Sequence, residues 1–454
     1  MKWSIPHWKQ EPPEGKEKQP WMTRWFHNAK SPWLLVEGFA LVIVIGTILL
    51  WLPISVYPGH QLNLIEALFT ATSAVCVTGL TVVPTSTTFN WFGKTVIGIL
   101  IQIGGMGIVL FLIAFMLIGK DKLGFKARSM FVTAQNLFGY ANVVDMARMI
   151  VLMTIIVEGT GAFLSFLIFL QDYDFWHALG YGIFHSVSAF NNAGFDLFGG
   201  SDSMLMYASN TPMIMLTSVL VIIGGFGFIA FLDILYNRFC FKHYKLTTKI
   251  TLVMTVFLLV FGTVFFYFTT DQTLLEAWFQ SVIARTAGFN SFPLANFTPA
   301  ALIIFIVLMF IGASPNSTGG GVKTNTIFAA GLKAISATTA HDEDSAFYRR
   351  IPESIFTKSF IILLYGVVVI LVGLLLILIA QPEFELMDLL VEVTSAFATV
   401  GSSVGITADL NEFSRCVIIV IMFIGRLGPI TIANLLIHKP ESKIEFTEEN
   451  ILIG

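Results

Sequence analysis

The chain has 454 residues, of which 55% are hydrophobic and only 12% are charged, and its mean hydropathy is +0.78. Soluble proteins carry about 25% charged residues, so this composition excludes an ordinary soluble domain and predicts an integral membrane protein. The net charge of −3 gives no basis for nucleic-acid binding. Three cysteines, Cys76, Cys240 and Cys416, are too few and too scattered for a disulfide framework or a cysteine-rich metal site.

A spanning helix needs about 20 mostly apolar residues, and eight stretches of the chain satisfy this requirement. They are residues 33–52, 92–118, 146–170, 212–235, 250–268, 299–329, 357–380 and 414–437. A polar arm, residues 1–31, precedes them; it carries six Lys/Arg and lacks the pattern of a cleavable signal peptide. We therefore expect an all-α membrane protein with eight spanning helices.

Between the members of each successive pair of spans lies a short apolar segment that runs into a glycine. The four segments are FTATSAVCVTGL (69–80), FHSVSAFNNAGF (184–195), FQSVIARTAGF (279–289) and VEVTSAFATVGSS (391–403). Each is too short to cross the membrane and too apolar for an ordinary loop, which is typical of a re-entrant helix surrounded by protein or water. Glycine then allows the chain to turn into an extended segment. Four such segments around one axis would make a ring of carbonyl oxygens that replaces the water shell of an ion.

Alignment of the four segments on their glycines defines a candidate filter. Its residues are Val77, Thr78 and Gly79; Asn192, Ala193 and Gly194; Thr286, Ala287 and Gly288; and Thr399, Val400 and Gly401. Six residues before the glycines stand Ser73, Ser188, Val282 and Ser395. Because the four filter sequences differ, we expect a short filter with one dominant ion site, formed at Val77, Asn192, Thr286 and Thr399.

The helix that follows each segment contains a second glycine, within IQIGGMGI, VIIGGFGF, MFIGASPN and MFIGRLGP. These glycines, Gly104, Gly224, Gly312 and Gly425, follow the filter glycines by 25, 30, 24 and 24 residues. The nearly constant spacing indicates duplication of one ancestral unit. We predict four pore repeats, residues 32–120, 121–238, 239–334 and 335–438, followed by a cytoplasmic tail, residues 439–454.

The distribution of charge predicts the orientation of the spans. Of the 26 Lys/Arg, 22 fall on one side of the eight-span arrangement, in the arm, the tail and the links around 119–148, 237–249 and 322–358. The opposite side, which holds the four re-entrant segments, has 13 Asp/Glu and one Lys/Arg, Arg285. The positive-inside rule therefore places both termini in the cytoplasm, and the acidic outer side would concentrate cations.

The sixth span is interrupted by ASPNSTGGGVKTNT, residues 313–326, in the second helix of the third repeat. A proline and three consecutive glycines cannot continue a helix at acceptable cost, and irregular backbone at membrane depth must face water or protein. We predict a gate beneath the filter, formed by Gly312, Ala313, Ser314, Pro315, Asn316, Ser317, Thr318, Gly319, Gly320 and Gly321. The alternative is a static kink. A phosphate-binding loop is disfavoured because GVKT stands where that motif requires GK[ST].

Arg426 directly follows Gly425 and should lie at the depth of the predicted gate. An arginine inside a spanning helix is a functional hypothesis by default, and we predict that it projects into the pore as a barrier to cations. The alternative is a buried ion pair with Glu158 in the third span. Arg285 ends a re-entrant helix, where a cation suits the helix dipole; we expect it to brace the filter from behind, with Glu392 as a candidate partner.

The fourfold order of helix, re-entrant helix, glycine and helix resembles the superfamily of Trk, Ktr and HKT potassium transporters over about residues 32–438. The similarity is greatest to the Ktr-type bacterial pore subunits, because no additional pair of spans precedes the first repeat. The resemblance implies that Gly79, Gly194, Gly288 and Gly401 form a potassium filter. Some plant members that favour sodium have serine at the first position, so Gly79 indicates potassium. The resemblance also supports the pore role of Arg426.

The same resemblance implies the partners and ions of the protein. Members of the family act in the cell membrane as homodimers in which each protomer has its own pore, and a separate cytoplasmic ring of RCK-type subunits that bind ATP or ADP regulates them. Potassium would be the transported ion and sodium an activator, with no organic cofactor in this chain. A sodium-coupled carrier with alternating access is the alternative; it predicts inverted repeats, whereas these units share one orientation. The spans lack HExxH, Ser–Lys and paired-Asp motifs, so we expect no enzymatic activity.

Overall fold

The computed structural model describes residues 31–118, 128, 130–132, 143–197, 203–238, 240–339 and 344–428. The predicted arm, apart from Ser31, and the predicted tail lie outside these residues. The described chain is predominantly helical, and its one sheet is a short antiparallel hairpin of β1 (Ser345–Ala346) and β2 (Arg349–Arg350). Ser345 pairs with Arg350 and Ala346 pairs with Arg349.

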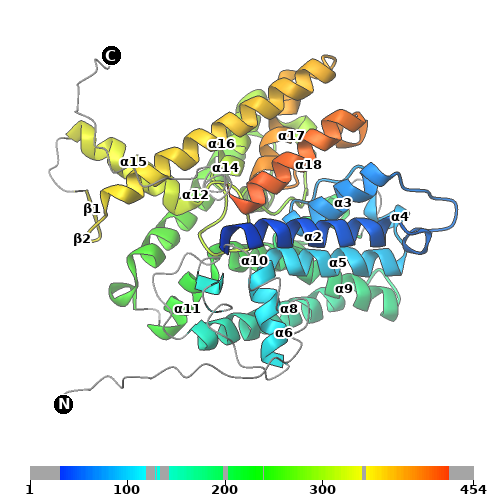
Figure 1. Cartoon of the computed structure of the whole chain (residues 1–454), viewed down its shortest axis with the longest axis horizontal. Coiled ribbons are helices and arrows are strands. Elements are labelled where there is room, and N and C mark those ends of the chain that lie inside the picture. The colour runs from blue at the N-terminus through cyan, green and yellow to red at the C-terminus, as the bar shows by residue number, and fades with distance from the viewer. Residues whose placement is uncertain are drawn as a thin grey trace, which may run out of the picture.

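A long helix, a short helix with a glycine-containing turn, and a further helix follow one another four times along the described chain (Figure 1). The first set contains α2 (Ser31–Trp51), η1 (Pro53–Ser55), α3 (Leu64–Cys76), α4 (Thr85–Thr88), α5 (Trp91–Met106) and α6 (Ile108–Ile118). The second contains α8 (Val143–Phe169), α9 (Phe175–Phe190), η2 (Ser203–Tyr207), α10 (Thr211–Phe226) and α11 (Phe228–Tyr236). The third contains η3 (Phe241–His243), α12 (Leu246–Thr269), α13 (Leu274–Ile283), η4 (Leu294–Asn296), α14 (Pro299–Phe310) and α15 (Thr324–Thr339). The fourth contains α16 (Glu353–Ala380), α17 (Leu386–Ala398), η5 (Ile406–Asp409) and α18 (Glu412–Leu427).

Side-chain caps determine where the helix after each glycine turn begins. Asn90 accepts hydrogen bonds from the Phe92 and Gly93 amides at 2.9 and 3.2 Å. The corresponding caps of the other three helices are Asn210, Thr298 and Asn411. An asparagine or threonine at this position satisfies amides that the first helical turn leaves without partners. The chain therefore re-enters the apolar region at four fixed points.

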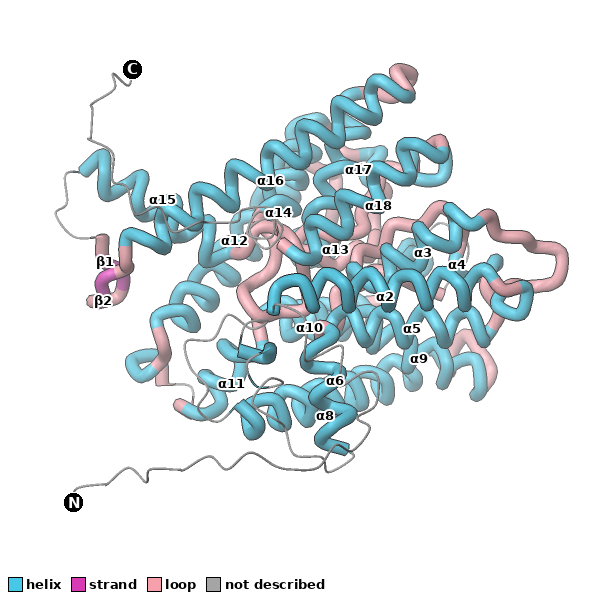
Figure 2. Tube along the Cα trace, in the orientation of Figure 1, coloured by secondary structure: helices cyan, strands magenta, loops and turns pink. Residues whose placement is uncertain are grey.

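The first and last helical sets pack against each other although they lie at opposite ends of the chain. α18 contacts α3, and one continuous apolar core contains buried residues of α2, α3, α5, α17 and α18. Figure 2 shows several loops passing through the centre of the molecule between the helices, while other loops lie at its edges. The described helices thus surround the central turns.

Two of the predicted spans are sharply bent, in contrast to the continuous helices expected for residues 92–118 and 212–235. α5 and α6 are bent by 103° at a break at Gly107, and α10 and α11 by 94° at a break at Gly227. Gly107 and Gly227 have φ values of +79° and +96°, which residues with a side chain rarely adopt. In the last set, α18 ends at Leu427 before Gly428, whose φ is +84°; the remainder of the span predicted over 414–437 lies outside the described residues.

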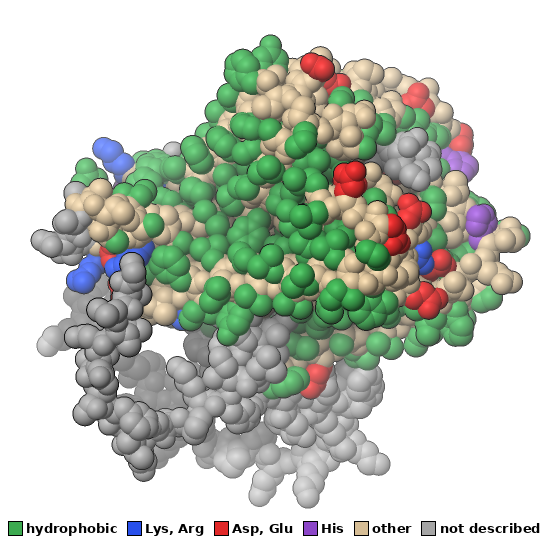
Figure 3. Space-filling view, turned by 90° about the horizontal axis from the view of Figure 1, so that it is seen from above, with side chains coloured by type: hydrophobic (Ala, Val, Ile, Leu, Met, Phe, Trp, Pro, Cys, Tyr) green, Lys and Arg blue, Asp and Glu red, His purple; other side chains and the backbone are tan. Residues whose placement is uncertain are grey.

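The surface of the described chain suits a membrane. Three helices, α8, α12 and α16, are long and apolar enough to cross one, and the number is up to five if each bent pair counts as one span. Figure 3 shows hydrophobic side chains across the middle of one face, with most acidic side chains toward one end and Lys/Arg gathered at the other. The fold is therefore that of an all-α membrane protein.

The glycine contacts between helices generate a testable prediction. A Cβ on Gly224 would lie 1.8 Å from the Phe190 carbonyl oxygen, whereas a Cβ on Gly159 would meet nothing within 4 Å. Gly224→Ala should therefore lower the thermal midpoint of the detergent-solubilised protein clearly, because overpacking typically costs about 1–3 kcal/mol. Gly159→Ala is the matched control and should leave the midpoint unchanged or raise it slightly. Equal midpoints for the two variants would contradict the packing described here.

Candidate ion-conduction site

Each of the four short helices ends in a turn with the same backbone pattern. The residue two positions before each predicted filter glycine has a positive φ: +58° at Val77, +58° at Asn192, +81° at Thr286 and +50° at Thr399. Each glycine also has a positive φ, between +69° and +92°. A residue with a side chain rarely adopts such angles, so their recurrence in four places indicates one shared local structure.

Serine hydroxyls brace three of the four turns. Ser73 accepts a hydrogen bond from the Gly79 amide at 3.0 Å, and Ser395 accepts the equivalent bond from Gly401 at 3.0 Å. Ser188 instead donates to the Phe195 carbonyl at 2.6 Å. The corresponding residue of the third turn is Val282, which has no hydroxyl. The serines that stand six residues before three of the filter glycines therefore form hydrogen bonds that hold their turns.

The four predicted filter glycines lie in a closed ring of neighbouring turns. A Cβ on Gly79 would lie 2.4 Å from the Ala193 carbonyl oxygen, and one on Gly194 would lie 2.7 Å from that of Ala287. A Cβ on Gly288 would lie 2.3 Å from the Val400 carbonyl oxygen, and one on Gly401 would lie 2.1 Å from that of Thr78. Each turn thus touches the next, and the fourth touches the first. Only glycine fits between turns at these distances.

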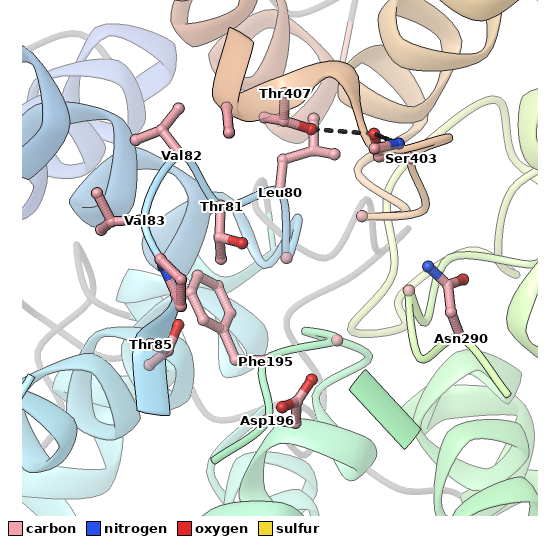
Figure 4. A pocket seen from close by; sticks show the side chains of 17 residues that line it. Leu80, Thr81, Val82, Val83, Thr85, Phe195, Asp196, Asn290, Ser403 and Thr407 are labelled. Atoms are coloured by element: carbon pink, nitrogen blue, oxygen red, sulfur yellow. Dashed lines mark hydrogen bonds between the residues drawn. The ribbon is translucent and has the colours of Figure 1, made fainter. Parts of the chain in front are cut away.

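A hollow opens on one side of this ring (Figure 4). All four glycines line it, and its volume is about 180 Å³. The segments after the glycines form much of its wall. The structure therefore brings together turns that the sequence separates by up to several hundred residues, and they share one cavity.

The predicted gate segment packs against the same turns. A Cβ on Gly319 would lie 2.1 Å from the Thr286 hydroxyl oxygen, and one on Gly320 would lie 2.2 Å from that of Thr399. The Thr318 hydroxyl lies 3.4 Å from the Asn192 side-chain oxygen. The loop therefore touches residues of the second, third and fourth turns at the positions where the dominant ion site is predicted.

The base of the loop is closed, so it is not a simple kink in a helix. Ile311 and Val322 form a parallel bridge, and the Ala313 amide donates to the Gly320 carbonyl at 3.3 Å. α14 thus ends at Phe310, the chain makes an excursion, and α15 begins at Thr324 after the chain has returned. The break predicted in the sixth span is present.

The loop packs into the bend between α10 and α11. The Phe228 amide donates to the Asn316 carbonyl at 2.8 Å, and the Ser314 amide donates to the Gly225 carbonyl at 3.1 Å. A Cβ on Gly227 would lie 2.4 Å from the Pro315 carbonyl oxygen. The helix bend and the loop therefore satisfy each other's backbone groups away from water.

Arg426 connects the loop to the first helical set. Its guanidinium donates to the Thr318 carbonyl of the loop and to the Gly104 carbonyl of α5, and it lies 3.3 Å from the Gly105 carbonyl. The last turn of a helix exposes carbonyl oxygens that favour a cation. The five donors of a guanidinium allow it to bridge two backbone segments at once.

Neither arginine forms the ion pair considered from the sequence, which was the alternative for Arg426 and a candidate for Arg285. Glu158 accepts a hydrogen bond from the Asn191 amide at 3.0 Å, and among the described residues no carboxylate pairs with Arg426. Glu392 accepts from the Thr407 hydroxyl at 2.6 Å instead of meeting Arg285. Arg285 is buried and lies beside a small cavity between α10, α12 and α13, behind its turn.

The sequence analysis did not recognise a further glycine in the helices that follow the first, second and fourth turns. Gly107, Gly227 and Gly428 each stand three residues after Gly104, Gly224 and Gly425, and each has a positive φ. The repeated spacing G-x-x-G was visible in the sequence and could have predicted that these helices stop or bend there.

Comparison with known proteins identifies the family. The sequence matches TrkH, a family described as cation transport proteins, over residues 17–270 and 244–446. It is 35% identical to the Ktr system potassium uptake protein B of Bacillus subtilis, covering 93% of this chain and 96% of that one. It is 34% identical to the potassium/sodium uptake protein NtpJ of Enterococcus hirae, with coverage of 93% and 96%.

The fold is also that of a solved structure. The crystal structure of the potassium transporter TrkH from Vibrio parahaemolyticus superposes with a TM-score of 0.71 at 20% sequence identity, and the match covers 90% of this chain and 86% of that one. With the family match over most of the sequence, the chain belongs to the TrkH family of membrane cation transport proteins, and this family is not one of enzymes.

Proposed function

We propose that this protein is the pore-forming membrane subunit of a potassium uptake system. Potassium ions would pass through a single pore at the centre of four repeated units with eight spans, and the ring of turns at Gly79, Gly194, Gly288 and Gly401 would be its selectivity filter. The observation that carries the proposal is the closed contact of these turns between a hollow on one side and the loop on the other. The names of the relatives, potassium uptake proteins in two organisms, support the choice of ion.

The filter chemistry follows from the backbone of the turns. Backbone carbonyl oxygens that replace an ion's hydration shell allow a dehydrated cation to enter. With glycine and the residue two positions before it both at positive φ, successive carbonyls of each turn do not alternate as they do in an ordinary strand. Val77, Asn192, Thr286 and Thr399 would contribute the dominant potassium site.

Residues 312–321 would act as the gate, with Arg426 as its latch. In the arrangement described above the loop lies directly under the filter turns, and a hydrated ion has no room between Gly320 and Thr399. The Arg426 guanidinium ties Thr318 to α5, and it would also place a positive charge on the path of a cation. Opening would require this bridge to break and the loop to move.

The remaining expectations complete the proposal. The protein would lie in the cell membrane with both termini in the cytoplasm, which the separation of acidic and basic side chains in Figure 3 supports. It would form a homodimer and would bind a cytoplasmic RCK-type ring that responds to ATP or ADP; the wording "Ktr system" for relatives supports a system of several components. Sodium would act as an activator; the Enterococcus hirae relative is named a potassium/sodium uptake protein, so its name links both ions to uptake.

Replacing the first filter glycine tests the selectivity filter. Gly79→Ser would place a Cβ 2.4 Å from the Ala193 carbonyl oxygen and disturb the ring. The ratio of potassium to sodium flux in proteoliposomes should fall by about tenfold, a difference of about 1.4 kcal/mol between the two ions. Gly59→Ser is a matched control, because Gly59 also has a positive φ, +95°, but a Cβ there meets nothing within 4 Å. An unchanged flux ratio in Gly79→Ser would contradict the filter assignment.

Shortening the loop tests the gate. A deletion within residues 316–321 removes backbone that packs under the turns and against α10 and α11. Potassium flux without any cytoplasmic partner should rise by about tenfold, which corresponds to a barrier lower by about 1.4 kcal/mol. Shortened proteins that fold but conduct no faster than the intact chain would remove the loop from the gating role.

Substitution of Arg426 separates a charge barrier from a latch. Arg426→Ala removes both and should raise potassium flux by at least about tenfold, since charges interact strongly in a poorly screened cavity. It should leave the potassium-to-sodium ratio unchanged, because the guanidinium bonds the loop and α5 and no filter residue.

Arg426→Lys keeps the charge but cannot bridge two segments with a planar fork. A rise in flux in Arg426→Lys nearly as large as in Arg426→Ala would show that the bridge is the main barrier; flux like that of the unchanged protein would assign the barrier to the charge. The thermal midpoints of both variants are measured on the same preparations. Loss of stability without a gain in flux in either variant would refute a gating role and indicate a structural one.

A further inference from the structure

In each segment that leaves the filter ring, a buried residue is followed by a partly exposed one. The residue directly after each glycine is buried: Leu80, Phe195, Phe289 and Ser402 are at most 1% exposed. The next residue is partly exposed in all four segments and lines the hollow. Leu80 and Phe195 also border the hollow. Position two after the glycine is nevertheless the first at which all four segments contribute a lining residue.

The four residues at that position form a second ring. They are Thr81, Asp196, Asn290 and Ser403. Each has an oxygen-bearing side chain, although the four segments share little other sequence beyond the glycine. Figure 4 shows the four side chains around the same hollow, each from a different segment of the chain. Hydroxyl, amide and carboxylate oxygens are the ligands that hard cations prefer.

We propose that this second ring is an outer binding site for a partly hydrated monovalent cation, at which potassium waits before it enters the filter. The inference rests on the proposed function and adds to it a site and a residue, Asp196, that determines cation capture. Four side-chain oxygens at the rim of a water-filled hollow can replace part of a hydration shell while waters complete it.

Asp196 supplies the negative charge of this site. Among the described residues that line the hollow, Asp196 has the one carboxylate, and no lysine, arginine or histidine lines it. A single carboxylate attracts a cation without binding it so firmly that release into the filter becomes slow. One negative charge with three neutral oxygens therefore suits a monovalent ion in transit.

Hydrogen bonds hold the opposite part of the ring in place. The Ser403 oxygen accepts from the Gly405 amide at 2.9 Å and lies 3.1 Å from the Thr407 hydroxyl. The single hydrogen of the Thr407 hydroxyl lies within reach of both the Ser403 oxygen and the Glu392 carboxylate, which is 2.6 Å away. The buried Glu392 carboxylate holds the Thr407 hydroxyl, which in turn contacts Ser403, so these hydrogen bonds fix the position of the Ser403 oxygen.

The test compares potassium uptake by proteoliposomes that contain the unchanged protein, Asp196→Asn or Asp271→Asn, over a range of potassium concentrations at low ionic strength. Asp271 is exposed and does not line the hollow, so its variant has the same change in net charge. Asp196→Asn should raise the half-saturating potassium concentration by about three- to tenfold, since a carboxylate attracts a cation strongly in a partly screened site, and should affect the maximal flux less. High salt should reduce the difference.

A variant that moves the carboxylate within the ring distinguishes loss of the charge from a defect in folding. The double variant Asp196→Asn with Asn290→Asp moves the carboxylate to the next position of the ring and should restore the half-saturating concentration to near that of the unchanged protein. Equal half-saturation in Asp196→Asn and Asp271→Asn, or no recovery in a folded double variant, would overturn the outer site. Absence of potassium flux in the unchanged protein would instead contradict the proposed function, so the two failures are distinguishable.

Discussion

The backbone of the four turns is the constraint on which the rest of the structure depends. Of the eight non-glycine residues with positive φ in the described chain, four stand two positions before a predicted filter glycine. Three of these, Val77, Thr286 and Thr399, are β-branched, for which this conformation is most unfavourable. Such strain costs on the order of 1–3 kcal/mol for each residue and persists only where the surroundings determine it. The serine braces and the ring of glycine contacts provide these surroundings.

The four short helices that precede the glycine turns could be predicted because their signals are local. α3 and α13 begin at capping boxes, Asn63 with Glu66 and Thr273 with Glu276, and end where a turn needs glycine. The interruption in the sixth span was equally local, since a proline and three glycines prevent a helix whatever surrounds them. Composition and the positions of Lys/Arg then predicted a membrane protein. For these reasons the all-α fold and the family agree with the predictions made from the sequence.

The bends at Gly107 and Gly227 and the partners of the arginines depend on contacts between distant segments. Gly227 allows a bend, but the loop around Asn316 determines that the bend forms, because the Phe228 amide donates to it. The alternative pairing of Arg426 with Glu158 rests on their similar depth in the membrane, whereas the direction in which each helix faces decides which groups meet. Glu158 faces Asn191 and Gln102 of other helices. Sequence periodicity in helices that are apolar on all sides does not reveal this direction.

The third helical set differs from the other three in a way that explains why one loop lies under the ring. In the other sets Gly104, Gly224 and Gly425 pack against the carbonyl end of their own short helix, at Val75, Phe190 and Phe397. Gly312 instead contacts Gly320 of its own loop, so the chain turns inward where the other helices continue. Val282 also leaves this turn without the hydroxyl that braces its neighbours.

Four identical sets would place either four loops or none beneath the ring. A change in one set leaves room for one flexible segment, and the glycine breaks and Arg426 from the other sets supply its contacts. Arg426 and the helix bend at Gly227 hold the loop. A small shift in either could therefore release it without disturbing the turns that the serines brace. Duplication accounts for the ring of turns, and divergence of one copy accounts for the single loop that packs against it.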